Sequence, residues 1–139
     1  MFAIRFIDHI VLRVVDPDAM VHFYCAGLGC TLEKRQDDIG LIQLRAGQAL
    51  IDLVPIAGAL GRAGGAAPAP DGRNVDHFCL RVDPFDPVAI RAQLAPFGVA
   101  IGEVARRYGA EGHGPSIYVT DPEGNTVELK GPATALPEI

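Results

Sequence analysis

The sequence lacks three features that would indicate particular classes of protein. Its 12 Lys and Arg against 17 Asp and Glu leave a net charge of −5, whereas a nucleic-acid partner requires a basic face. It has no uncharged apolar run near the roughly 18 residues of a membrane span. Its first residues run directly into a strand pattern, without the apolar core and cleavage site of a signal peptide. We therefore expect no nucleic-acid partner, no membrane association and no secretory leader.

Cysteine is also scarce. The three cysteines are an odd number without a paired framework, which favours reduced thiols and a cytoplasmic location. Cys25 and Cys30 have no second pair of ligands nearby and are a poor zinc signature. The 139 residues suffice for one compact domain with a substantial core.

An internal repeat is the most informative feature that is present. Residues 8–14 (DHIVLRV) and 76–82 (DHFCLRV) share five of seven residues at a spacing of 68. A motif repeated at a spacing of about half the chain length indicates two similar modules. Each module contributes one histidine at the same place, His9 in the first and His77 in the second.

Each half predicts the same order of elements, a strand, a helix and three strands. Alternating apolar residues indicate strands, and Asp16-Pro17 and Asp86-Pro87 indicate helix starts. The first module is predicted to contain strand 4–14, a helix from 17 to the glycines at 27–29, and strands 31–36, 40–44 and 49–54. The second is predicted to contain strand 75–82, a helix from 87 to Gly98, and strands 99–106, 116–120 and 126–130.

The predicted fold is α+β, with two tandem βαβββ modules that form a curved mixed sheet around a metal-binding cavity. Module one covers residues 4–55 and module two residues 75–132 of a single domain. The Gly-, Ala- and Pro-rich segment 56–74 is predicted to be a linker or a mobile loop.

Strand alternation predicts that His9, His77 and Glu128 all point to the face that the helices leave uncovered. Two imidazoles and a carboxylate leave coordination positions open on a divalent ion, and this set suits iron, zinc, manganese, cobalt or nickel. A single strand histidine is more often a packed or surface residue, and Glu128 alone fits a solvated strand position. The repeated Asp-His pair favours metal binding.

Residues 114–129 (GPSIYVTDPEGNTVEL), an aromatic strand, a DPxGN turn and a strand with a glutamate, resemble the closing segment of the vicinal oxygen chelate superfamily. This family includes glyoxalase I, fosfomycin-modifying enzymes, bleomycin-resistance proteins and extradiol dioxygenases. The resemblance implies that His9, His77 and Glu128 bind one divalent metal ion. In the family this ion holds two adjacent oxygens of a small-molecule substrate. The resemblance also implies a homodimer.

The resemblance raises the question of catalytic partners. Asp52 stands where glyoxalase I has a glutamate that serves as fourth ligand and candidate base; the shorter side chain either reaches the metal, acts through water or is structural. If Thr120 pairs with Thr126, Tyr118 lies opposite Glu128. Its phenol then orients the carboxylate, binds substrate or packs in the cavity wall.

Further polar residues are candidates for binding substrate. Arg13 and Arg81 are predicted on the same strand faces as the histidines, where they either hold an anionic group or pair with carboxylates at the rim. Ser116 is predicted opposite Lys130 on this face, and His113 is predicted in a flexible loop that either closes on substrate or is simply exposed.

The sequence therefore predicts a metal-dependent, glyoxalase-like lyase or isomerase, in which a base moves a proton beside a metal-bound carbonyl. The alternatives are a thiol transferase of the fosfomycin-resistance type, a ring-cleaving dioxygenase and a metal-free drug-binding protein of the bleomycin-resistance type. The intact His9, His77 and Glu128 set favours an enzyme over the last of these.

Overall fold

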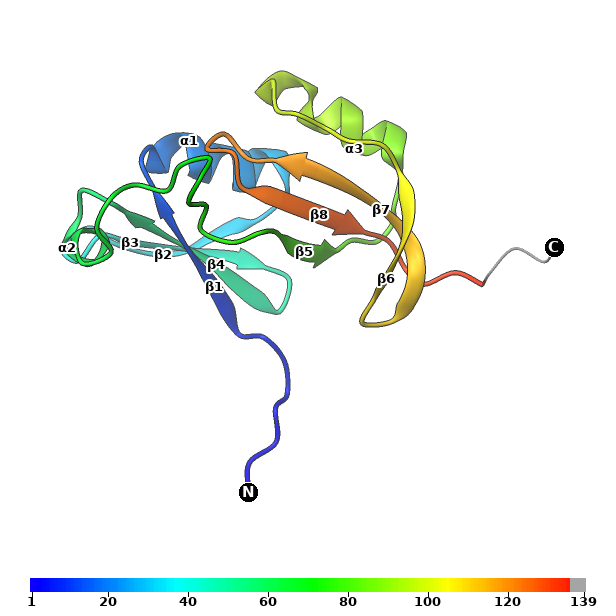
Figure 1. The fold of residues 1–139 in the computed structure, drawn as a ribbon, viewed down its shortest axis with the longest axis horizontal. Helices are drawn as coiled ribbons and strands as arrows, with labels where there is room; N and C mark the ends of the chain where they lie inside the picture. The colour runs from blue at the N-terminus through cyan, green and yellow to red at the C-terminus, as the bar shows by residue number, and fades with distance from the viewer. Residues whose placement is uncertain (136–139) are drawn as a thin grey trace. The chain divides into compact units, whose positions relative to one another are not determined.

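The computed structural model describes residues 1–135 and divides the chain into two compact units, one covering residues 1–74 and one beginning at Val75. Each unit contains one four-stranded mixed sheet built by a βαβββ module (Figure 1). The predicted α+β fold of two tandem modules is confirmed. Within residues 1–135, no helix is long and apolar enough to cross a membrane.

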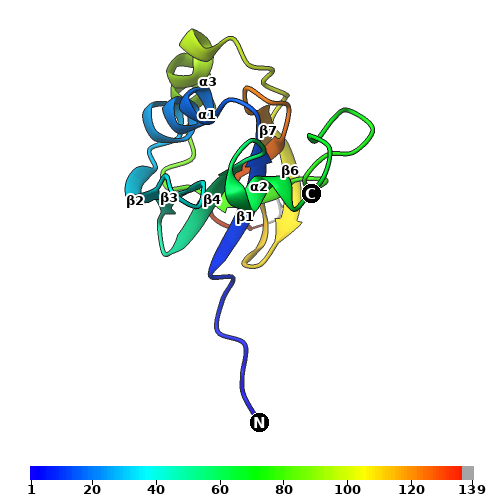
Figure 2. The same ribbon diagram turned by 90° about the vertical axis from the view of Figure 1, so that its left-hand side faces the viewer.

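The first unit has the sheet order β1-β4-β3-β2, in which β1 is parallel to β4 and the other neighbours are antiparallel. Figure 2 shows α1 on one side of β2, β3 and β4. Its elements are β1 (His9–Val14), α1 (Pro17–His22), a π-helical turn (Phe23–Gly27), β2 (Thr31–Gln36), β3 (Leu41–Ala46), β4 (Ala49–Pro55) and the short α2 (Ala59–Arg62).

The core of the first unit follows from the amphipathic patterns. Asp16 caps α1 by accepting a hydrogen bond from the backbone N–H of Ala19, as the sequence predicts. The helical segment buries Met20, Phe23 and Tyr24. The sheet completes this core with apolar side chains of β1, β3 and β4: Leu12, Val14, Ile42, Leu44, Ile51, Leu53 and Val54. The burial of these side chains supplies the main driving force for folding this unit.

The second unit repeats this plan with the sheet order β5-β8-β7-β6, again with a parallel first pair. Its helix starts at the predicted cap Asp86 and buries Leu94. It ends at Gly98, whose φ of 62° is a left-handed conformation that glycine adopts without strain. Its elements are β5 (Phe78–Arg81), α3 (Pro87–Leu94), a 3-10 turn (Ala95–Phe97), β6 (Ala105–Gly109), β7 (Gly112–Thr120) and β8 (Thr126–Lys130).

The first strand of each module is shorter than the sequence pattern predicts. Strand β1 begins at His9 rather than at residue 4, because its parallel partner β4 offers no residue to pair with the chain before Asp8. Ile4 and Phe6, which alternation places on the same face as Leu12 and Val14, are exposed. The segment before β1 leaves the sheet in Figures 1 and 2. Alternation alone therefore overestimates a strand that runs past its neighbour.

Two further predictions need correction. The strand predicted at 99–106 is wrong, because residues 100–102 make only an isolated bridge to β7 and the regular strand β6 begins at Ala105. The segment 56–74, whose role as a linker stays a prediction, contains a helical turn, α2. His113 lies in β7 and not in a loop, because β6 and β7 pair as far as Gly109 and Gly112.

The turn between β7 and β8 depends on one buried carboxylate. Asp121 accepts hydrogen bonds from the backbone N–H groups of Glu123 and Asn125, each at 2.9 Å, and from the Asn125 amide at 2.8 Å. We expect Asp121→Ala to lower the free energy of unfolding by about 3 kcal/mol, because it removes these bonds and leaves buried donors unpaired. The measurement is urea denaturation. The exposed cap variant Asp16→Ala is the control, with an expected loss of about 1 kcal/mol, and an equal loss in both variants would contradict the prediction.

Candidate functional site

The repeated Asp-His pair has the same local geometry in both units. In the first, Nδ1 of His9 lies 2.7 Å from a carboxylate oxygen of Asp8, and in the second Nδ1 of His77 lies 2.6 Å from one of Asp76. An ionised carboxylate only accepts hydrogen bonds, so Nδ1 carries the proton and the neutral ring keeps its lone pair on Nε2. Histidines that bind metals are usually held in this way by a second carboxylate.

In the second unit, Nε2 of His77 lies 3.5 Å from Oε2 of Glu128. A lone pair on Nε2 and a carboxylate oxygen repel one another, and a metal ion bound between them would offset this repulsion. Two donor atoms bound to one tetrahedral ion at about 2.1 Å are about 3.4 Å apart. The donor set and its spacing therefore fit a divalent metal ion without rearrangement.

The register of β7 and β8 places an aromatic side chain beside this pair. Thr120 pairs with Thr126 and Tyr118 pairs with Glu128, as predicted. The Tyr118 ring meets the His77 ring edge to face at a centroid distance of 5.4 Å. Tyr118 therefore fixes the plane of the His77 imidazole.

An arginine that the sequence analysis left out completes this arrangement. The guanidinium of Arg107 in β6 lies 4.3 Å from the centre of the Tyr118 ring and donates hydrogen bonds to the hydroxyl and carbonyl of Ser116. The sequence carried no signal for it, since the strand was predicted to end one residue earlier. Ser116 is fully buried and occupied by Arg107, which argues against its predicted contact with substrate.

In the first unit, Asp52 occupies the position that corresponds to Glu128 of the second unit. Asp52 is buried and pairs with Gln43, whose amide donates to both carboxylate oxygens at 3.3 Å. The hydrogen bond to Asp8 raises the pKa of His9, burial opposes this shift, and the nearby charge of Asp52 adds to it. Gln43 and Asp52 thus correspond to Tyr118 and Glu128 of the second unit.

The predicted ligands come from both units. His77 and Glu128 lie together in the second unit, whereas His9 belongs to the first. Within residues 1–135, no three His, Cys, Asp or Glu side chains form a cluster that could hold a metal ion. The assignment of His9, His77 and Glu128 as a common ligand set stays a prediction.

Arg13 holds a loop. Its guanidinium donates to the backbone carbonyls of Gly61, Gly65 and Ala66, at 2.7–2.9 Å. These contacts anchor the segment after α2 and argue against the predicted role of Arg13 in binding substrate.

The remaining two candidates also have partners within the second unit. Nε of Arg81 lies 2.8 Å from a Glu111 carboxylate oxygen, which is the rim pairing that the sequence left open. The His113 ring packs against Tyr108 at a centroid distance of 4.9 Å.

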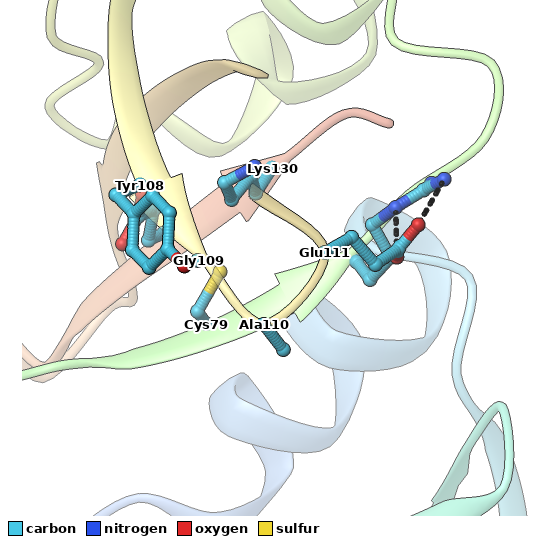
Figure 3. A pocket seen from close by; sticks show the side chains of 8 residues that line it. Cys79, Tyr108, Gly109, Ala110, Glu111 and Lys130 are labelled. Atoms are coloured by element: carbon cyan, nitrogen blue, oxygen red, sulfur yellow. Dashed lines mark hydrogen bonds and ion pairs between the residues drawn. The ribbon is translucent and has the colours of Figure 1, made fainter. Parts of the chain in front are cut away.

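A cavity of about 210 Å³ opens on the same face of the second unit (Figure 3). It lies between β5, β8 and the β6–β7 hairpin, and the ion pair of Arg81 and Glu111 stands at its edge. The lining residues are Cys79, Arg81, Tyr108, Gly109, Ala110, Glu111, Glu128 and Lys130. The cavity therefore shares Glu128 with the candidate metal site.

Cys79 lines this cavity, and its thiol should react slowly. Although Cys79 is exposed, partial desolvation of its thiol raises its pKa to about 11, and the Glu128 carboxylate adds to the shift. At pH 8 about one molecule in a thousand then carries the reactive thiolate.

We expect Glu128→Gln to lower the pKa of Cys79, because it removes the negative charge beside the thiol. Alkylation of Cys79 by iodoacetamide in chelator-treated protein should then be faster, and peptide mass spectrometry measures its rate. Glu33→Gln is the control, and equal rates in all three proteins would contradict the role of Glu128.

The duplicated βαβββ fold and the Asp-His pair in each module define the class of protein. The sequence profile of the Glyoxalase/Bleomycin resistance protein/Dioxygenase superfamily matches residues 6–129. The chain belongs to this superfamily.

Solved structures share the fold of this chain. An integron cassette protein from the mobile metagenome of V. cholerae is 26% identical and superposes with a TM-score of 0.73, over 96% of this chain and 99% of that chain. The fosfomycin resistance protein FosX from Mesorhizobium loti is 14% identical, with a TM-score of 0.68 over 94% and 95% of the two chains. Lactoylglutathione lyase from Agrobacterium tumefaciens is 21% identical, with a TM-score of 0.62 over 91% and 92%. No curated protein matches the sequence.

Proposed function

We propose that the chain is a metal-dependent lyase or isomerase of the glyoxalase type that acts on a small substrate with neighbouring oxygens. The observation that carries the proposal is the His77–Glu128 pair, with two ligand atoms 3.5 Å apart and Nδ1 of His77 held by Asp76. The same Asp-His geometry in the first unit supports His9 as a further ligand. When bound, a divalent ion supplies Lewis-acid stabilisation of negative charge on substrate oxygens.

The chain's own residues would orient the reacting groups and move the proton. Tyr118, held by Arg107, keeps the His77 ring in one plane. Asp52 is the candidate base, because its buried carboxylate is oriented by the Gln43 amide but is not neutralised by a cation within residues 1–135. A base of this kind removes a proton from the carbon beside a polarised carbonyl.

The test is elemental analysis of untagged protein after exhaustive dialysis and reconstitution, followed by an assay for formation or cleavage of lactoylglutathione. We expect about one zinc, nickel, cobalt, manganese or iron ion per chain, with turnover that depends on the ion. Protein that takes up no metal even on reconstitution would contradict the proposal. The bleomycin-resistance type of metal-free binding would then be the function to test.

A further inference from the structure

Lys130, at the end of β8, is a buried cation for which the described residues provide no partner. Lys130 is 5% exposed and lines the 210 Å³ cavity. Among residues 1–135, no hydrogen-bond or ion-pair partner of its ammonium is found. In that range, Nε of Arg13 is the only side-chain nitrogen or oxygen that is both fully enclosed and without a partner. Since Nζ of Lys130 also has no partner there, it is not fully enclosed and is accessible from the cavity.

The β6–β7 hairpin leaves room for this side chain. A Cβ atom at position 109 would lie 2.8 Å from Cε of Lys130, and one at position 114 would lie 3.0 Å from Nζ. Because side chains larger than glycine at Gly109 or Gly114 would crowd the lysine, both glycines hold the space through which it reaches the cavity. The position of the Lys130 side chain therefore depends on the two glycines in the sequence.

The other charged groups of the cavity have assignments of their own. Arg81 is neutralised by Glu111 at 2.8 Å, and Glu128 is the candidate metal ligand 3.5 Å from Nε2 of His77. Lys130 is thus the one lining cation that lacks a counter-ion within the described part of the chain. Burial of an unpaired charge is unfavourable, and an anion that enters the cavity would offset this cost.

We propose that this cavity binds a carboxylate of the substrate and that Lys130 recognises it. The inference rests on the proposed function and narrows the substrate to a small organic acid whose neighbouring oxygens lie next to Glu128. The size agrees, since the cavity of about 210 Å³ is smaller than the roughly 300–1,000 Å³ typical of sites for drug-sized ligands. A compact ammonium donates strong, charge-assisted hydrogen bonds to carboxylate oxygens.

The test compares pyruvate with diacetyl, which replaces one carboxylate oxygen by a methyl group, keeps two adjacent oxygens and has no charge. Affinities are measured by NMR titration of metal-free and zinc-reconstituted protein. We expect the wild type to bind pyruvate about tenfold to a hundredfold more tightly than diacetyl. Lys130→Met should remove this preference. Lys34→Met, which removes the chain's other lysine from the exposed strand β2, should keep it.

A second readout on the wild type keeps the proposal testable if Lys130→Met does not fold. With 15N-labelled lysine, the ammonium resonance of Lys130 should shift on addition of pyruvate but not of diacetyl, and that of Lys34 should shift with neither. Equal affinities for the two ligands, or a Lys130 resonance that does not move, would overturn the proposal.

The metal content of the same samples separates the two proposals. Pyruvate selectivity that requires Lys130 in a protein that takes up no metal would support this site while contradicting the enzymatic function. Metal uptake without that selectivity would overturn this site alone.

Discussion

Replacing Glu128 by glutamine should abolish binding of the proposed metal ion. The substitution keeps the size of the side chain but removes the negative charge beside Nε2 of His77. We expect an affinity loss larger than the roughly 10–100-fold that changes in supporting residues cause, and loss of any metal-dependent turnover. His77→Ala should have the same effect. Elemental analysis after dialysis measures both.

The matched control is Glu103→Gln in the same unit, because Glu103 is highly exposed and forms a long ion pair with Arg91, at 3.5 Å. This variant should keep the metal content of the wild type. Glu128→Gln protein that keeps its metal while His77→Ala protein loses it would show that the carboxylate is not a ligand. Both variants must retain the urea denaturation midpoint of the wild type to within a small shift for the comparison to hold.

Removing the carboxylates behind the histidines should weaken metal binding without removing a ligand. In Asp76→Asn and Asp8→Asn, a neutral amide replaces the acceptor that lies 2.6 Å or 2.7 Å from Nδ1. We expect each variant to lose about 10–100-fold in metal affinity. Competition with a chromophoric chelator measures this loss. Asp18→Asn, an exposed acid in the first turn of α1, is the control and should behave as the wild type.

Asp8→Asn should also change the protonation of His9. The hydrogen bond to Asp8 is the main reason that the pKa of His9 is raised, so its loss should lower this pKa. A lower pKa reduces competition by protons and would by itself favour metal binding at acidic pH. Affinities are therefore compared across a series of pH values, and an NMR titration of the His9 ring follows the pKa. A pKa that does not fall would contradict the assigned hydrogen bond.

The supporting residues of the site were only partly predictable. The sequence placed Tyr118 opposite Glu128, because the DPEGN turn fixes the register of the two strands around it. It gave no reason to include Arg107 or Gln43, because both act through cross-strand neighbours whose identity depends on register. It placed Lys130 on the correct face but could not reveal that this cation is buried and has no partner among residues 1–135.

The functions assigned to the arginines and to His113 depended on contacts that alternation cannot show. The two-residue period of a strand predicts which face of β1 carries Arg13. It cannot show that the guanidinium binds backbone carbonyls of a loop some 50 residues away in the chain. The same holds for Arg81, which pairs with Glu111 of the hairpin. His113 changed from loop to strand because β6 continues past the point at which its apolar pattern ends.

The sequence by itself determined the duplicated βαβββ plan, the two helix caps, the β7–β8 register and the repeated Asp-His pair, since each depends on residues close together in the chain. The tertiary structure decided where β1, β5 and β6 begin, because a strand extends only as far as its neighbour offers hydrogen bonds. It also decided that His77 faces Glu128 at 3.5 Å and that Lys130 reaches a cavity held open by two glycines. These are long-range contacts, and packing of distant segments sets them.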